Sequence, residues 1–194
     1  MMLELMLAPV LHPMVGGARV MTVLTLLVAL SAIGVRVDTL VLFVPALIAE
    51  LLASHWHTGW AVPAAVFRLV FLCYVLALVL WRVLRDRTVT LDTVAGSACA
   101  YMLIGALWGE LYVLTEHWRP SSFEIPSGLM GGNDLQIALA YFSYQTLTSV
   151  TYGDIRPTTA AVGGLCLAEA ITGQLYLAIM IARLVGIHTA QRTG

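Results

Sequence analysis

The chain has 194 residues, of which 60% are hydrophobic and 11% are charged, and its mean hydropathy is +0.89. A water-soluble domain does not carry so much apolar sequence, so the composition indicates an integral membrane protein surrounded by the lipid bilayer. The net charge is −1 and the ten basic residues are arginines spread along the chain, so the sequence offers no basic surface for nucleic acid.

Apolar segments long enough to cross a bilayer as helices follow one another along the chain. A helix needs about 20 apolar residues, with about 17 as the lower limit, to cross a hydrocarbon core of roughly 30 Å. Five segments have this length: Arg19 to Val35, Thr39 to His55, Ala61 to Leu84, Leu91 to Glu116 and Thr158 to Ile187. Residues 2–15 are apolar but short and contain two prolines, and they form either a further span or an interfacial segment. We therefore expect an all-α integral membrane protein with five or six spans.

The cysteines Cys73, Cys99 and Cys166 all fall inside apolar segments, without the spacing of a metal site. We expect them to be buried as small hydrophobic side chains rather than joined in a disulfide.

In the apolar segment from Ala61 to Leu84, no arginine stands between Arg68 and Arg82. A voltage-sensing helix needs a ladder of arginines that carries gating charge, so we expect no strong voltage dependence. Glu50 in the preceding span is expected at a similar depth, and we predict an ion pair between Arg68 and Glu50.

A polar run lies between the last two long segments, where residues 146–155 read TLTSVTYGDI. This run resembles the selectivity filter of tetrameric potassium channels, whose TVGYG loops use backbone carbonyls in place of the hydration shell of K⁺. The letters SVTYG stand at residues 149–153, so Ser149 replaces a threonine and Thr151 replaces the first glycine of the pattern.

The resemblance implies the potassium-channel pore fold in the second half of the chain. Residues 89–194 would form the ion-conducting pore domain, with an outer helix, a pore helix at about Leu135 to Thr148, the filter and an inner helix. The polar stretch from Trp118 to Asp134 would be an exposed turret. Residues 1–88 would add three or four transmembrane helices. Each chain supplies one strand of the ion-binding ring, so a homotetramer is implied.

The resemblance also implies roles for single residues. The ion-binding residues of the filter would be Ser149, Val150, Thr151, Tyr152 and Gly153, with K⁺ bound at the first four. The filter would be supported by Gln145, Thr148 and Asp154, with a hydrogen bond expected between Gln145 and Asp154. The gate and the cavity would be formed by Gly173, Gln174, Leu177 and Ile181. Gly173 is either a hinge or a site of close helix packing, and Glu169 is either functional or a hydrogen-bonding group behind the filter.

The function implied by this resemblance is passive K⁺ transport, with K⁺ as the permeant ion and no cofactor. In such filters the first glycine has a left-handed backbone, which costs about 1–2 kcal/mol for a residue with a side chain and more for a β-branched threonine. Thr151 therefore leaves open a weakly selective or nonselective channel that also passes Na⁺. A non-conducting scaffold or regulatory subunit with a pore fold is a further alternative. No nucleophile and base converge in one segment, so no enzyme is expected.

The resemblance places the loop before the filter outside the cell. Most arginines beyond the spans then lie in the cytoplasm, as the positive-inside rule requires. The few residues after Gly186 are too short for a soluble ligand-binding domain. We expect a multi-pass protein of the bacterial plasma membrane, by likeness to small bacterial channels with six segments.

Overall fold

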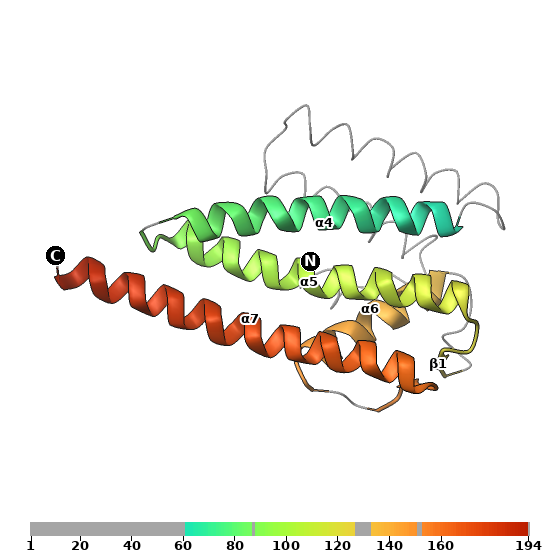
Figure 1. Cartoon of the computed structure of the whole chain (residues 1–194). Helices are drawn as coiled ribbons and strands as arrows, with labels where there is room; N and C mark the ends of the chain where they lie inside the picture. The colour runs from blue at the N-terminus through green and yellow to red at the C-terminus, as the bar shows by residue number, and fades with distance from the viewer. Residues whose placement is uncertain (1–60, 87, 127–132, 151–152, 194) are drawn as a thin grey trace.

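The computed structural model describes residues 61–86, 88–126, 133–150 and 153–193 (Figure 1). Within these ranges the chain forms the helices α4 (Ala61–Arg85), α5 (Leu91–Trp118), α6 (Asn133–Leu147) and α7 (Ala160–Thr193). Two short strands, β1 (Phe123–Glu124) and β2 (Arg156–Pro157), lie before α6 and after it. The described part of the chain is thus almost entirely helical, as the composition predicts.

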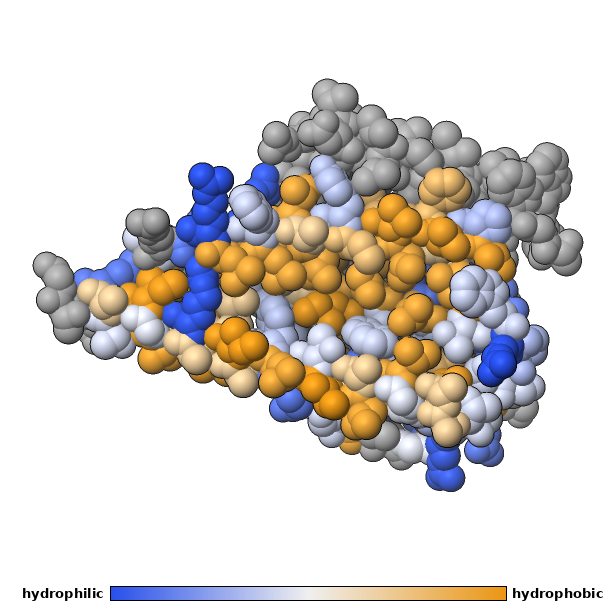
Figure 2. Space-filling model, viewed as in Figure 1, coloured by the Kyte–Doolittle hydropathy of each residue, from blue (hydrophilic) through white to orange (hydrophobic). Residues whose placement is uncertain are grey.

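Three of these helices are long and apolar enough to cross a membrane, namely α4, α5 and α7. They confirm the spans predicted at Ala61 to Leu84, Leu91 to Glu116 and Thr158 to Ile187. The other two predicted spans and residues 2–15 lie outside the described residues. Figure 2 shows the apolar surface over the middle of the helices, with hydrophilic residues gathered toward their two ends. This distribution matches a bilayer core between two polar boundaries.

α4 packs against α5 through a row of apolar residues spaced four apart, which places them on one face of the helix. The row and its partners form one buried cluster: Phe71, Leu72, Val75, Val79, Val83, Ala100, Leu103 and Met180. Gly96 of α5 lies so close to α4 that a Cβ atom there would come within 2.8 Å of Val83 Cγ2. Thr90 ends the turn between the helices and accepts a hydrogen bond from the Thr93 amide, as an N-cap residue does.

The short helix α6 lies between α5 and α7 near one end of the bundle (Figure 1). Its bounds confirm the pore helix expected at about Leu135 to Thr148. A second buried cluster surrounds it, in which the rings of Tyr112, Phe123 and Phe142 have their centroids 5.2 to 5.5 Å apart. Contacts between aromatic edges and faces at these distances stabilise the junction of α5 and α6.

The two strands pair in antiparallel register, with Phe123 opposite Pro157 and Glu124 opposite Arg156. The Thr158 hydroxyl also donates to Ser121 O at 2.7 Å, next to the ladder. The prediction of an exposed turret is therefore wrong for part of the stretch, because Phe123 and Ile125 are buried. Their apolar side chains complete the cluster around Tyr112.

The three cysteines are free, as predicted. Cys99 and Cys166 are half-buried, but Cys73 is exposed, so its predicted burial is wrong. Cys73 follows Phe71 by two positions on α4 and therefore points away from the face that packs on α5.

Candidate functional site

The pore helix α6 ends in a tight C-terminal turn at the start of the filter-like run. The amide of Val150 donates to Gln145 O and the amide of Ser149 donates to Thr146 O, both at 3.0 Å. Ser149 has φ of 59°, in the left-handed region. These features form a Schellman motif, which satisfies the last carbonyls of a helix and usually carries glycine at the left-handed position. Serine there costs about 1–2 kcal/mol.

The residues after this turn are described only in part. Thr151 and Tyr152 lie outside the described residues, so the left-handed backbone expected at Thr151 remains a prediction. Gly153 has φ of +80°, which glycine adopts without strain. Its carbonyl accepts a hydrogen bond from Arg156 Nε at 2.9 Å.

The inner helix α7 contacts the beginning of the filter-like run through Gln174. Gln174 Nε2 donates to Ser149 Oγ at 3.0 Å, and both residues are exposed in the single chain. Val150 is 55% exposed. The described residues of the expected filter and cavity therefore lie on a surface that this chain alone does not cover.

The hydrogen bond expected between Gln145 and Asp154 is absent from the described structure, and that prediction is wrong. Gln145 is 5% exposed, and neither its Oε1 nor its Nε2 has a partner. Asp154 is exposed, and its Oδ1 accepts the amide of Ile155. The two side chains do not meet because one lies in the interior and the other on the surface.

Gly173 allows the inner helix to approach the end of the pore helix closely. A Cβ atom at this position would lie 2.4 Å from Leu147 O and 2.9 Å from Leu147 Cδ1. Tyr101 of α5 donates its hydroxyl to the same carbonyl at 3.1 Å. A Cβ at Gly163 or Gly164 would meet no atom within 4 Å. Of the two roles left open for Gly173, the structure therefore supports close packing.

Glu169 joins three helices. The Tyr112 hydroxyl of α5 donates to its Oε2, and Ser143 Oγ of α6 lies 2.5 Å from its Oε1. Ser143 also donates to Gly105 O of α5 at 2.7 Å. Glu169, Tyr112 and Ser143 are each 0% exposed. Glu169 is thus a buried hydrogen-bonding group, which is the second of its two expected roles.

A second buried carboxylate contacts the pore helix near its N-terminal end. Glu110 of α5 forms an ion pair with Arg68 of α4, with Oε1 3.0 Å from Arg68 Nε. Gln136 of α6 donates to the same oxygen at 3.0 Å. The predicted partner Glu50 lies outside the described residues. Arg68 is therefore part of a link between α4, α5 and α6 that the sequence analysis did not foresee.

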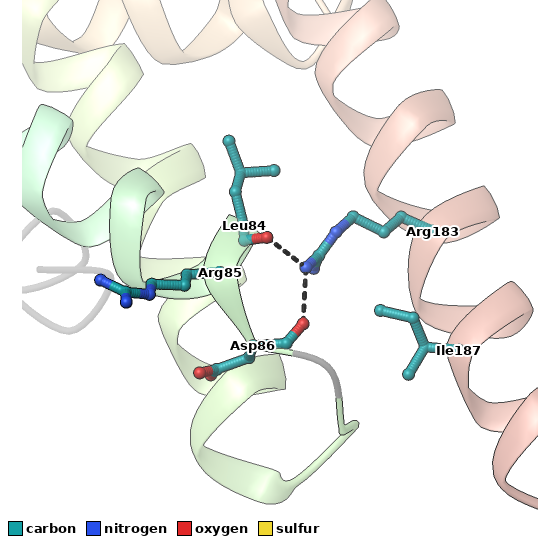
Figure 3. Close-up of a pocket in the computed structure, with 5 residues that line it drawn as sticks. All are labelled: Leu84, Arg85, Asp86, Arg183 and Ile187. Carbon is teal, nitrogen blue, oxygen red and sulfur yellow. Dashed lines mark hydrogen bonds between the residues drawn. The ribbon is translucent and has the colours of Figure 1, made fainter.

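At the opposite end of the bundle, α7 is attached to the turn between α4 and α5. Arg183 Nη2 donates to the carbonyls of Leu84 and Asp86, each at 2.8 Å (Figure 3). These residues, together with Arg85 and Ile187, line a shallow pocket. Arg85 points away from Arg183 in this view, so the pocket does not bring two guanidinium groups together.

Comparison with known proteins gives one family. Residues 135–189, which include most of α6 and all but the last residues of α7, match the model of a family described as an ion channel. No curated protein and no solved structure matches the chain.

Several supporting residues were missed by reading the sequence, namely Tyr112, Ser143, Glu110 and Gln136. The signal for two of them was present, because Glu110 and Ser143 are polar residues inside apolar helices, and such residues face the protein interior.

Proposed function

Since residues 135–189 match the model of an ion channel family, we propose that this chain is one subunit of a homotetrameric potassium channel. The observation that carries the proposal is that the filter-like sequence begins within the C-terminal turn of the pore helix, at Ser149 and Val150. A helix C-terminus carries about half a negative charge. Four such ends directed at one axis would favour a cation there over an anion.

The inner helix supports a tetramer. Only 17% of the most hydrophobic part of α7 is buried within the chain. Its exposed side chains include Ile171, Leu175, Leu177 and Ile181, together with the polar Gln174. A helix that lipid alone surrounds needs no exposed glutamine, whereas a helix that faces a water-filled cavity can carry one. In the proposed tetramer Gln174, Leu177 and Ile181 face this cavity.

In the proposed filter, the carbonyls of Ser149, Val150, Thr151 and Tyr152 replace the hydration shell of K⁺, as in the TVGYG loop. The Ser149 hydroxyl is held by Gln174, which fixes the lower end of the strand next to the inner helix. K⁺ selectivity requires that Thr151 keeps its carbonyl directed at the ion. A channel in which Thr151 turns this carbonyl away would pass Na⁺ as well.

The division of the chain into residues 1–88 and a pore domain of residues 89–194 is part of the same proposal. The only described helix of the first part is α4, and its Arg68 is neutralised by Glu110 of α5. A charge fixed in this way does not move across the membrane field, so the proposed channel has no strong voltage dependence.

Flux of K⁺ and of Na⁺ into liposomes that contain the purified full chain tests the proposal. K⁺-selective flux in the parent is the expected result, and it would mean that Thr151 keeps the conducting backbone. The variant Thr151→Gly serves as the control, since glycine removes the strain. Equal K⁺ and Na⁺ flux in the parent, with K⁺ selectivity only in Thr151→Gly, would identify a nonselective channel. Absence of flux in both would contradict the channel function and favour a scaffold.

A further inference from the structure

Three oxygen-to-oxygen contacts form a continuous chain in the interior beside the pore helix. They join Tyr112 to Glu169, Glu169 to Ser143, and Ser143 to the carbonyl of Gly105. The chain starts at Tyr112 of α5, passes through α7 and α6, and returns to α5 at Gly105, about two helical turns away. All of its side chains are fully buried.

The number of protons in this chain can be counted. Two oxygen atoms at hydrogen-bond distance need a proton between them, because otherwise only lone pairs face each other. The Gly105 carbonyl has no proton, so the Ser143 hydroxyl supplies the one in that contact. The Tyr112 hydroxyl supplies the proton in its contact with Oε2. The contact between Ser143 Oγ and Glu169 Oε1 still needs a proton, and only the carboxyl group can supply it.

The surroundings of Glu169 favour the same state. A carboxylate that is buried without a cation is costly, and it becomes neutral instead. The titratable side chains that interact with Glu169 among the described residues are Tyr101 and Tyr112 of α5 and Cys166 of α7, and none of these is a cation. Glu110 differs, since the Arg68 guanidinium lies at hydrogen-bond distance from it.

We propose that Glu169 is a neutral carboxylic acid that donates its proton to Ser143 Oγ, and that it is a positioning residue for the pore helix. Ser143 lies two residues before Gln145 in the last two turns of α6, so the hydrogen bond fixes this end of the helix between α5 and α7. The consequence for ion selection rests on the proposed function. The protonation state does not, because it follows from the contacts within one chain.

Infrared spectroscopy of the purified full chain at neutral pH tests the protonation state without any ion flux. The difference spectrum of parent minus Glu169→Gln should contain the carbonyl stretching band of a protonated carboxylic acid. In Ser143→Ala this band should move to higher frequency, because the acid no longer donates a hydrogen bond to Oγ. If Glu169→Gln does not fold, the difference between parent and Ser143→Ala gives the same band and its shift. Carboxylate bands in place of the acid band would overturn the proposal.

Comparison of Glu169→Gln with Glu169→Ala tests the positioning role. Glutamine can accept from Tyr112 and donate to Ser143, so it replaces the neutral acid in both contacts, whereas alanine replaces neither. We expect Glu169→Gln to keep the K⁺ to Na⁺ flux ratio of the parent and Glu169→Ala to lower it. Equal ratios in all three proteins would overturn the positioning role. Absence of flux in the parent would count against the channel function. The unfolding temperature of each variant then tests the positioning role, and a lower unfolding temperature in Glu169→Ala but not in Glu169→Gln supports that role.

Discussion

Two buried glutamates hold the pore helix α6, one near its first turn and one near its last. Near the first turn, Glu110 is compensated by the Arg68 cation and by Gln136. Toward the last turn, Glu169 meets the hydroxyls of Tyr112 and Ser143 and, among the described residues, no cation. The same residue type is thus placed inside a membrane protein in two ways, with a positive charge or with a proton. The ion pair requires both charged residues, whereas the neutral acid can be replaced by a neutral group of the same shape.

The largest expected effect on stability comes from breaking the buried ion pair. Arg68→Ala leaves the Glu110 carboxylate buried without its cation, and such a loss lowers the free energy of unfolding by roughly 3–5 kcal/mol. Thermal unfolding in detergent, monitored by gel filtration of the protein that stays folded, measures the effect. The double variant Arg68→Met with Glu110→Leu is the matched control, and it should recover most of the loss since no charge remains. A double variant as unstable as Arg68→Ala would mean that packing rather than charge is responsible.

Close packing on the side of α7 gives the next largest effect. Gly173→Ala places a Cβ atom against the carbonyl oxygen of Leu147, which is backbone and cannot turn aside. Overpacking of this kind costs typically 1–3 kcal/mol of the free energy of unfolding. Gly164→Ala is the control, because a Cβ there meets no atom within 4 Å. Similar unfolding temperatures for both variants would show that α7 moves away from α6 at little cost.

The turn at the end of α6 offers a smaller test. Ser149→Gly and Ser149→Ala both remove the hydroxyl that accepts from Gln174, but only glycine relieves the left-handed backbone. The glycine variant should therefore be more stable than the alanine variant by about 1–2 kcal/mol. Unfolding by denaturant in detergent provides the comparison. An alanine variant of equal stability would argue against the left-handed conformation at this residue.

The smallest effect is expected for the neutral glutamate. Glu169→Gln keeps one donor and one acceptor, so the free energy of unfolding should change by less than about 1 kcal/mol. Glu110→Gln removes the carboxylate that pairs with the Arg68 cation and should cost several times more. The two variants are measured side by side by thermal unfolding. Equal losses would remove the distinction between the charged glutamate and the neutral one.

The long elements were predictable from the sequence because length and hydropathy determine which helices cross a bilayer. The three described spans and the pore helix were placed within two residues of their bounds, except that α7 continues six residues past the predicted end, to Thr193. Two short strands were not predicted, because two-residue pairings such as Phe123 with Pro157 leave no alternating pattern in the sequence. The strands form where apolar residues of this otherwise polar stretch pack against Tyr112.

Pairings between side chains were less predictable than positions along the chain. The sequence shows that Arg68 and Glu169 need partners inside the membrane, but any polar residue at the same depth is a candidate. Helix rotation selects the partner, and for Arg68 it brings Glu110, which is 42 residues away, within reach. The expected pair of Gln145 and Asp154 does not form, since the Gln145 side chain lies in the interior and Asp154 lies on the surface.

The short ladder between β1 and β2 also has a consequence for the order of assembly. It brings together the two ends of a segment that contains the pore helix and the filter-like run. Closing a flexible loop of roughly thirty residues costs about 3 kcal/mol in chain entropy, beyond a constant term. The strand pairing, the Thr158 hydrogen bonds and the burial of Phe123 offset this entropy. The segment with α6 then folds as a loop whose ends are already closed. A single chain can therefore hold this segment in place by itself, before it meets any partner of the proposed tetramer.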